Sequence, residues 1–371
     1  MEDAKEAGPR FSAGKSIYGF SRSKIDDSNT LLGNRFLCRG GGILLVAPSG
    51  MGKSTFTMQA AALWSCGKSA FDISPHKALR ILIVQSEDDD GDCIEMSEMI
   101  DHLGLSDDEK TLVDANTVVI RCNDLTSEKF LQALDAQLSE SKFDLVIINP
   151  YSSYLGADVV DTEANIRFLH VGLNPLLAKT GHNIGALIVC HTTKTNKGLD
   201  FSAMNPWDFQ YLSAGAAAIT NWARGMIVIV PQKCDPKLFK FVAAKRGDKI
   251  GWGDPERYFT HSSSGVSCWE HASKEQIKKA EKDKAAKEKA ANLSWQEVIE
   301  KILSPIDPID IDQWLVKTKA HPFKIGENRA RSILNAGVAE GIVTVEEVPR
   351  HNTRPKELYR KASKSNNGSH L

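Results

Sequence analysis

The sequence predicts an α/β domain with a mostly parallel sheet, followed by a small domain with a winged-helix arrangement. Short, continuous apolar runs alternate with segments of helical periodicity up to about Trp269, which is typical of parallel strands covered on both faces. A charged stretch then separates this region from a last segment with a pattern of its own. The expected parts are a polar leader over 1–30, the α/β domain over 31–270, a charged helical linker over 271–292, the winged-helix domain over 293–362 and a flexible tail over 363–371.

Composition narrows the classes of protein. The 371 residues include 46 Lys and Arg against 47 Asp and Glu, a net charge of −1, so any nucleic-acid affinity must come from local patches. Seven cysteines without a C-x-x-C pair suit a reducing compartment and imply neither a disulfide framework nor zinc. Without an apolar signal core or a run of membrane-spanning length, we expect a cytoplasmic protein with no membrane partner.

The first predicted strand enters a phosphate-binding motif. Apolar Ile43–Val46 leads into a loop, and a helix follows from Phe56 to Trp64. The loop matches G-x-x-x-x-G-K-[ST] except that Ala47 stands where the first glycine is usual; it reads Ala47, Pro48, Ser49, Gly50, Met51, Gly52, Lys53, Ser54, Thr55. Its backbone N–H groups and the helix N-terminus would hold ATP, with Lys53 on the β- and γ-phosphates and Ser54 on Mg²⁺.

Later strands and helices follow in alternation. Further strands are expected at 79–85, 118–120, 145–148, 186–189, 226–230 and 239–242, with a closing hairpin over 258–269. Helices are expected near 94–103, 130–138 and 162–179.

An acidic run follows the second strand. Glu87 comes just past its carboxyl end, the edge at which parallel sheets bind ligands, and would polarise the water that attacks the γ-phosphate. Asp88 to Asp90 would cap the next helix.

A Walker B pattern ends in an amide. Asn149 follows the apolar strand 145–148 in place of the usual aspartate, so it would contact Mg²⁺ through water and supply no charge. The alternative is a plain buried strand followed by a turn-forming Asn149-Pro150 pair.

Three basic positions and one histidine complete the candidate site. His191, at the tip of the strand over 186–189, would sense the γ-phosphate, although a lone histidine is more often structural. Arg224 and the Lys245-Arg246 pair would reach a neighbouring subunit's γ-phosphate. The alternative for these basic residues is an ordinary surface salt bridge.

The last segment predicts three helices and a basic-tipped hairpin. The linker before it has no apolar stripe, which favours a solvated helix over a DNA-binding patch. Helices are expected at 295–303, around 311–315 and from about 326 to 341, although Gly337 inside the third could end it a turn early. The turn between the final strands carries Arg350, His351, Asn352 and Arg354. Such a domain would contact DNA or another protein.

Taken in this order, the segments resemble the RecA-like P-loop ATPases, and among them the hexameric replicative helicases of the plasmid RepA type. The motifs that carry the resemblance are 47–54, 86–88, 145–150, 191–194 and 215–224. It implies ATP and Mg²⁺ as cofactors, Glu87 as catalytic base, His191 as sensor and Arg224 acting in trans. Cys190 and Asn149 depart from the family's usual His and Asp.

The resemblance also implies a nucleic-acid partner. The segments 151–158 and 194–211 would face the central channel of a ring, where their aromatic residues would stack on single-stranded DNA. The alternative is that these aromatic residues pack the loops.

The implied function is an ATP-hydrolysing, DNA-associated motor that forms a homo-oligomeric, hexameric ring and acts as a replicative-type DNA helicase. Replication proteins or duplex DNA would bind the winged helix. Two alternatives stay open: a recombination or repair ATPase without unwinding, and a nucleotide-gated DNA-binding regulator, which Asn149 favours.

Overall fold

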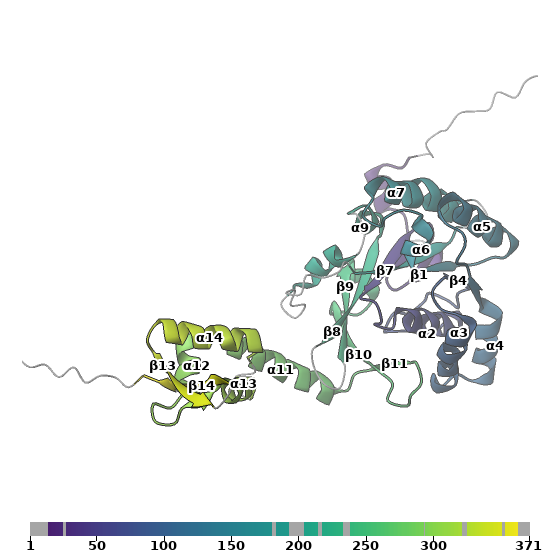
Figure 1. Ribbon diagram of the computed structural model, residues 1–371. Helices are drawn as coiled ribbons and strands as arrows, with labels where there is room; N and C mark the ends of the chain where they lie inside the picture. The colour runs from purple at the N-terminus through teal and green to yellow at the C-terminus, as the bar shows by residue number, and fades with distance from the viewer. Residues whose placement is uncertain are drawn as a thin grey trace, which may run out of the picture. The chain divides into compact units, whose positions relative to one another are not determined.

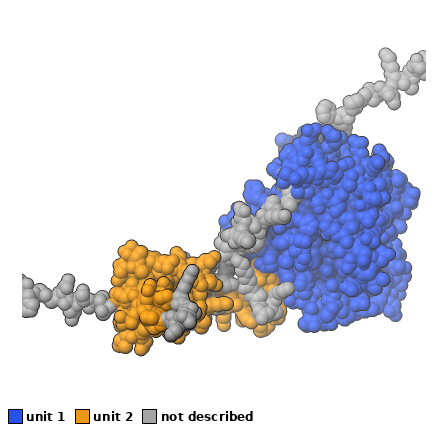
Figure 2. Space-filling model, in the orientation of Figure 1, with its two compact units in different colours: residues 1–231, 239–270 blue, residues 232–238, 271–371 orange. Residues whose placement is uncertain are grey.

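The computed structural model describes residues 14–24, 27–179, 183–192, 204–213, 217–232, 238–292, 294–320, 325–350 and 353–362. It divides into two compact units (Figures 1 and 2). The larger comprises residues 1–231 with 239–270, and the smaller comprises 232–238 with 271–371. In the part of the chain so described, no helix combines the length and the apolar character needed to cross a membrane.

A nine-stranded sheet, counted over the described residues, forms the centre of the larger unit, in the order β11-β10-β9-β8-β3-β7-β6-β4-β5. The strands are β3 (Gly42–Ala47), β4 (Ile81–Gln85), β5 (Thr117–Arg121), β6 (Leu145–Asn149), β7 (Gly185–His191), β8 (Gly225–Gln232), β9 (Leu238–Lys245), β10 (Glu256–His261) and β11 (Trp269–His271). Neighbours from β8 to β5 run parallel, whereas β9 and β10 are antiparallel. The predicted mostly parallel α/β sheet is confirmed.

Helices cover both faces of this sheet because its central strands are apolar throughout. Leu44 and Val46 belong to a core with α5 and η3, whereas Ile43 and Leu45 belong to a second core with α2. Figure 1 shows α2 to α4 on one side of the sheet and α5 and α7 on the other. The helical segments are α2 (Lys53–Ser65), α3 (Asp90–Ser97), η2 (Glu98–His102), α4 (Asp107–Asn116), α5 (Ser127–Glu140), α6 (Tyr151–Leu155), α7 (Thr162–Ile166), η3 (Arg167–Leu173), α8 (Asn174–Ala178), η5 (Pro206–Leu212), α9 (Ala217–Trp222) and α10 (Gly247–Ile250).

Helix α4 was not predicted, although its start signal is present. Ser106 accepts from the N–H of Glu109, and the Glu109 carboxylate accepts from the N–H of Ser106, which is a complete capping box. Only Val113 of this helix is buried. The helix therefore lacks the apolar stripe on which the periodicity argument depends.

The N-terminal region forms a small sheet separate from the nine-stranded one. It contains α1 (Ile17–Ser21), η1 (Asp27–Asn29) and the two-stranded hairpin of β1 (Thr30–Leu32) and β2 (Leu37–Cys38). Arg39, just after this hairpin, forms an ion pair with Asp144 at the entry to β6. Burial favours the neutral acid, but hydrogen bonds from the Arg80 N–H and from Arg39 hold the pKa of Asp144 below its usual value.

The smaller unit combines helices with an antiparallel sheet of order β12-β14-β13. Its elements are α11 (Lys274–Asn292), α12 (Trp295–Ile302), β12 (Ile309–Asp310), α13 (Ile311–Lys319), α14 (Glu327–Ala339), β13 (Val343–Arg350) and β14 (Thr353–Lys361). Helix α14 continues through Gly337, where a Cβ would lie 2.3 Å from Ile299 Cδ1 and 2.8 Å from Val343 Cγ2, so the glycine permits a close approach of α12. Of the expected basic turn, His351 and Asn352 lie outside the described residues.

Candidate nucleotide site

The loop between β3 and α2 has the backbone of an anion-binding nest. Gly50 and Gly52 adopt φ of 73° and 78°, in the left-handed region that glycine enters at no steric cost. Gly52 caps α2, and its carbonyl accepts from the N–H of Phe56 at 2.9 Å. The preceding N–H groups at the helix start have no such partner within the helix, and the helix dipole adds positive potential there. The loop can therefore hold phosphate oxygens.

Lys53 is buried beneath this loop. Its ammonium donates to the carbonyls of Ala47 at 3.3 Å and Pro48 at 2.9 Å, and it lies 3.1 Å from Nδ1 of His191. Burial lowers the pKa of Lys53, and the negative charge of Glu87 opposes that shift. The two carbonyls are acceptors only, which suits the protonated, positively charged form of Lys53.

His191 links Lys53 to Glu87. The register of β3 against β7 pairs Ala47 with His191, which brings the strand tip beside the loop. His191 Nε2 lies 3.6 Å from Glu87 Oε1, an electrostatic contact that is too long for a hydrogen bond. With Lys53 protonated, Nδ1 is the acceptor of this contact, which assigns the proton of the neutral imidazole to Nε2, on the side of Glu87. Burial and the Lys53 charge lower the pKa of His191, which keeps the ring neutral at pH 7.

A second group of polar side chains surrounds Ser54. Asn149 Nδ2 donates to Ser54 Oγ at 3.2 Å, and the pairing of Gln85 with Asn149 places the end of β4 beside them. The Ser54 hydroxyl also interacts with the carboxyl of Asp88. Burial raises the pKa of Asp88 above its usual value, and the interaction with Ser54 opposes that shift.

The structure corrects one role assigned to Asp88. The cap of α3 is Asp89, whose carboxylate accepts from the N–H of Asp92 at 2.9 Å while Asp92 accepts from the N–H of Asp89. Asp88 is therefore not part of the cap. Because Asp88, Asp89 and Asp90 are the same residue type, the sequence does not show which of them caps the helix.

The sequence predicted the closing hairpin, now β10 and β11, but not that it lies against the phosphate loop. The Trp269 indole N–H donates to the Gly52 carbonyl at 3.1 Å, and the His261 ring lies 4.0 Å from the Trp269 ring. Gln59 of α2 fixes Trp269 by accepting from its N–H at 2.8 Å and donating to its carbonyl at 2.9 Å. Trp269, near the C-terminal end of the larger unit, therefore contacts the phosphate loop. No local sequence pattern reveals a contact over this separation.

The other predicted basic residues lie at the opposite end of the parallel strands, where β3 and β8 begin. The Arg224 N–H donates to Gly42 at the start of β3, and the Lys245 ammonium donates to the Thr220 carbonyl just before β8, at 2.8 Å in both cases. Arg246 follows Lys245 with a left-handed φ of 54°. Five residue steps along β3 separate this end from the phosphate loop, roughly 16 Å. Arg224, Lys245 and Arg246 thus do not join Lys53 and Glu87 within one chain.

The aromatic residues expected to stack on DNA divide into two kinds. Tyr151 and Tyr154 were wrongly assigned, because both are fully buried and their hydroxyls donate to Asn165 and to the Cys122 carbonyl. They pack the core instead. Trp207 and Tyr211 on η5 are 66% and 75% exposed. Residues 193–203 of that segment lie outside the described part of the chain.

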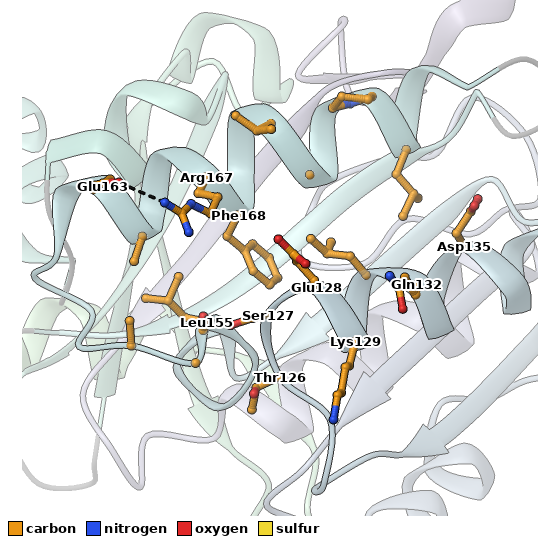
Figure 3. Close-up of a pocket in the computed structure, with 18 of the residues that line it drawn as sticks. Thr126, Ser127, Glu128, Lys129, Gln132, Asp135, Leu155, Glu163, Arg167 and Phe168 are labelled. Atoms are coloured by element: carbon orange, nitrogen blue, oxygen red, sulfur yellow. Dashed lines mark hydrogen bonds and ion pairs between the residues drawn. The ribbon is translucent and has the colours of Figure 1, made fainter.

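A groove elsewhere on the larger unit contains none of the predicted nucleotide-binding residues. It has a volume of about 1220 Å³ and lies between α5, which supplies Ser127 and Gln132, and the α7–η3 segment, which supplies Arg167 (Figure 3). Its lining mixes acidic, basic and apolar side chains.

The residues of the phosphate loop fit ATP and Mg²⁺. The left-handed glycines permit a close phosphate approach, and Ser54 and Asp88 present oxygen atoms of the kind that Mg²⁺ prefers, whereas Asn149 turns its Nδ2 toward Ser54. The described residues hold no group of three His, Cys, Asp or Glu side chains that could bind a metal by themselves. Mg²⁺ in nucleotide sites keeps several waters and is held by one or two carboxylates together with the substrate phosphates.

The fold and the loop define a P-loop ATPase domain, as expected. A family model described as AAA domain matches residues 10–197, just over half of the chain. The chain belongs to that family, which agrees with the predicted RecA-like ATPase core. Among solved structures, the RadB recombinase shares 14% identity at a TM-score of 0.42, over 67% of this chain and 96% of that one. No curated protein matches the sequence.

Proposed function

We propose that the chain hydrolyses ATP as a subunit of a DNA-associated oligomer, and that it is a ring-forming replicative-type helicase. The observation that carries the proposal is that the predicted site residues form two groups, one at each end of the parallel strands. Lys53, His191 and Glu87 meet at the carboxyl edge, and Arg224, Lys245 and Arg246 lie at the other.

The chemistry at the carboxyl edge follows from its contacts. Lys53 and the loop N–H groups hold the phosphates and compensate their charge. Glu87, whose side chain is 55% exposed, takes a proton from the attacking water. His191 presents its Nε2 proton to Glu87 and its Nδ1 to Lys53, so a change at the γ-phosphate that moves Lys53 alters the orientation of the base. Mg²⁺, when bound, neutralises charge on the phosphate oxygens.

The opposite edge supports oligomerisation. Arg224 is exposed and forms no ion pair with another described residue, which disfavours an ordinary surface salt bridge. An arginine side chain cannot span the roughly 16 Å to its own phosphate loop, so any triphosphate that Arg224 reaches belongs to another subunit. An arginine supplied in this way contributes about 10³–10⁵ in rate.

DNA contact is proposed at two places. Trp207 and Tyr211 lie four residues apart on η5 and are exposed, as stacking on single-stranded DNA requires. In the smaller unit, which we interpret as a winged helix, α14 exposes Asn328, Arg331 and Ser332 on one face. These side-chain types contact base edges of duplex DNA, or the same face could bind a replication protein.

A recombination or repair ATPase that forms filaments is the second candidate, because Arg224 could equally reach the phosphate loop of the next subunit in a filament. A nucleotide-gated regulator is favoured by Asn149 alone, because a neutral residue weakens metal-assisted turnover. One experiment separates the three: ATPase rate with and without a single-stranded oligonucleotide, native mass, and unwinding of a forked duplex.

The helicase predicts a six-subunit species, stimulation by single-stranded DNA and unwinding. Stimulation without unwinding supports the recombination or repair ATPase. A monomer that is not stimulated contradicts both motors. Trp207→Ala with Tyr211→Ala should reduce single-stranded DNA affinity by about 1–3 kcal/mol for each base that loses its stacking partner, with the basal ATPase rate unchanged. Unchanged affinity would remove η5 from the DNA site.

A further inference from the structure

We propose that Asp88 supplies the carboxylate for magnesium in this site, in place of the acid that Asn149 lacks. The inference rests on the proposed ATP site and names one of its ligands. It follows from where two successive carboxylates lie.

Glu87 and Asp88 point to different partners. Glu87 lies 3.6 Å from His191 at the tip of β7, whereas Asp88 interacts with the hydroxyl of Ser54 at the start of α2. The cap of α3 is made by Asp89, so Asp88 is not needed to start that helix. The two carboxylates are therefore placed for two tasks, one toward water and one toward the metal.

Gln85 fixes the main chain of Asp88. The Asp88 N–H donates to Gln85 Oε1 at 2.9 Å, and Gln85 Nε2 donates to the Asp88 carbonyl at 2.8 Å. Gln85 is itself buried at the end of β4, which pairs directly with β6 at Asn149. This double hydrogen bond holds Asp88 in a defined position beside Asn149.

The Ser54 hydroxyl interacts with both Asn149 and Asp88. It accepts from Asn149 Nδ2 at 3.2 Å, so its own proton is available to the Asp88 carboxylate. Asn149 contributes no charge, and Asp144, just before the start of the same strand, is paired with Arg39. Asp88 is thus the anionic side chain beside Ser54 that a hard divalent cation requires.

The test measures metal binding and not turnover. Affinity for a fluorescent ATP analogue is measured with Mg²⁺ and with EDTA, and Mn²⁺ binding to the protein–ATP complex is measured by electron paramagnetic resonance. Asp88→Asn should lower Mn²⁺ affinity by about 10–100-fold. In EDTA the same variant should bind ATP as well as or better than the wild type, because one negative charge near the phosphates is gone.

A carboxylate placed at position 149 should take over the role of the one removed from position 88 in Mn²⁺ binding. Asn149→Asp alone should tighten Mn²⁺ binding, and Asn149→Asp in the Asp88→Asn background should restore it. Asp89→Asn, which alters the neighbouring cap, is the matched control and should leave Mn²⁺ affinity unchanged. Thermal melting without metal checks that each variant folds.

The outcomes separate the two proposals. Wild-type protein that binds no ATP overturns the proposed function and this inference with it. Wild-type binding that Mg²⁺ strengthens, together with an Asp88→Asn variant of unchanged Mn²⁺ affinity, overturns the role of Asp88 alone. Failure of Asn149→Asp to restore Mn²⁺ binding to a folded Asp88→Asn variant would likewise count against a single missing carboxylate as the cause.

Discussion

The contact between the β10–β11 hairpin and the phosphate loop predicts unequal effects of two similar substitutions. Gly50 and Gly52 both have left-handed φ, so alanine at either costs about 1–2 kcal/mol in backbone strain. At Gly50 a Cβ would meet nothing within 4 Å, whereas at Gly52 it would lie 2.8 Å from His261 and 2.9 Å from Trp269.

The second clash is expensive because Trp269 cannot move freely. Its ring is packed in the core against Phe239 and Phe241, and Gln59 holds its backbone on both sides. Overpacking of this kind costs about 1–3 kcal/mol. Gly52→Ala should therefore destabilise the larger unit by about 2–5 kcal/mol, against about 1–2 kcal/mol for Gly50→Ala.

Differential scanning calorimetry measures this difference. The transition that MgATP raises belongs to the larger unit, since a ligand of the folded state stabilises the unit that binds it. Each kcal/mol lowers Tm by about 2–4 °C for a domain near this size. Equal Tm values for the two variants would refute the contact between the hairpin and the loop.

Three further predictions test other parts of the molecule. Mixing Arg224→Ala with Lys53→Ala protein should recover ATPase activity at mixed interfaces, and no recovery at any ratio would contradict action in trans. Because burial lowers the pKa of His191, its contribution to stability is present above the unfolded pKa of about 6.5 and is lost as pH falls through the folded pKa. His191→Gln should therefore flatten the dependence of Tm on pH below about 6.5, and an unchanged slope would assign that dependence to other groups. Gly337→Val should lower the melting transition of the smaller unit, because its side chain would overlap Ile299 and Val343, while ATP binding stays unchanged; an unaltered transition would show that α12 does not pack so closely.

Local pattern was sufficient for most of the sheet and for the residues at its carboxyl edge. Strands β3, β4, β6, β7 and β8 are continuous apolar runs, and their parallel order places Glu87, Asn149 and His191 together without further information. The helices that were missed, α4 among them, bury too little to show a period. The aromatic residues at 151 and 154 look like a binding loop in sequence because burial is not visible there.

Long-range contacts explain what could not be predicted. Trp269 and Gly52 are 217 positions apart, and the double hydrogen bond of Gln85 to Asp88 depends on a side-chain orientation. Asp88, Asp89 and Asp90 are equivalent by residue type. Only the geometry of the turn after β4 assigns one of them to Ser54 and the next to the helix cap.

The central claim is that this site hydrolyses ATP with Glu87 as its base, and a single comparison tests it most directly. ATP hydrolysis and ATP affinity are measured for wild-type and Glu87→Gln protein under the same conditions. We expect the variant to keep its affinity and to lose about 10²–10⁴ in rate, the usual contribution of a positioned general base. A variant that turns ATP over at the wild-type rate would contradict the assignment, and a wild-type chain without hydrolysis would contradict the function.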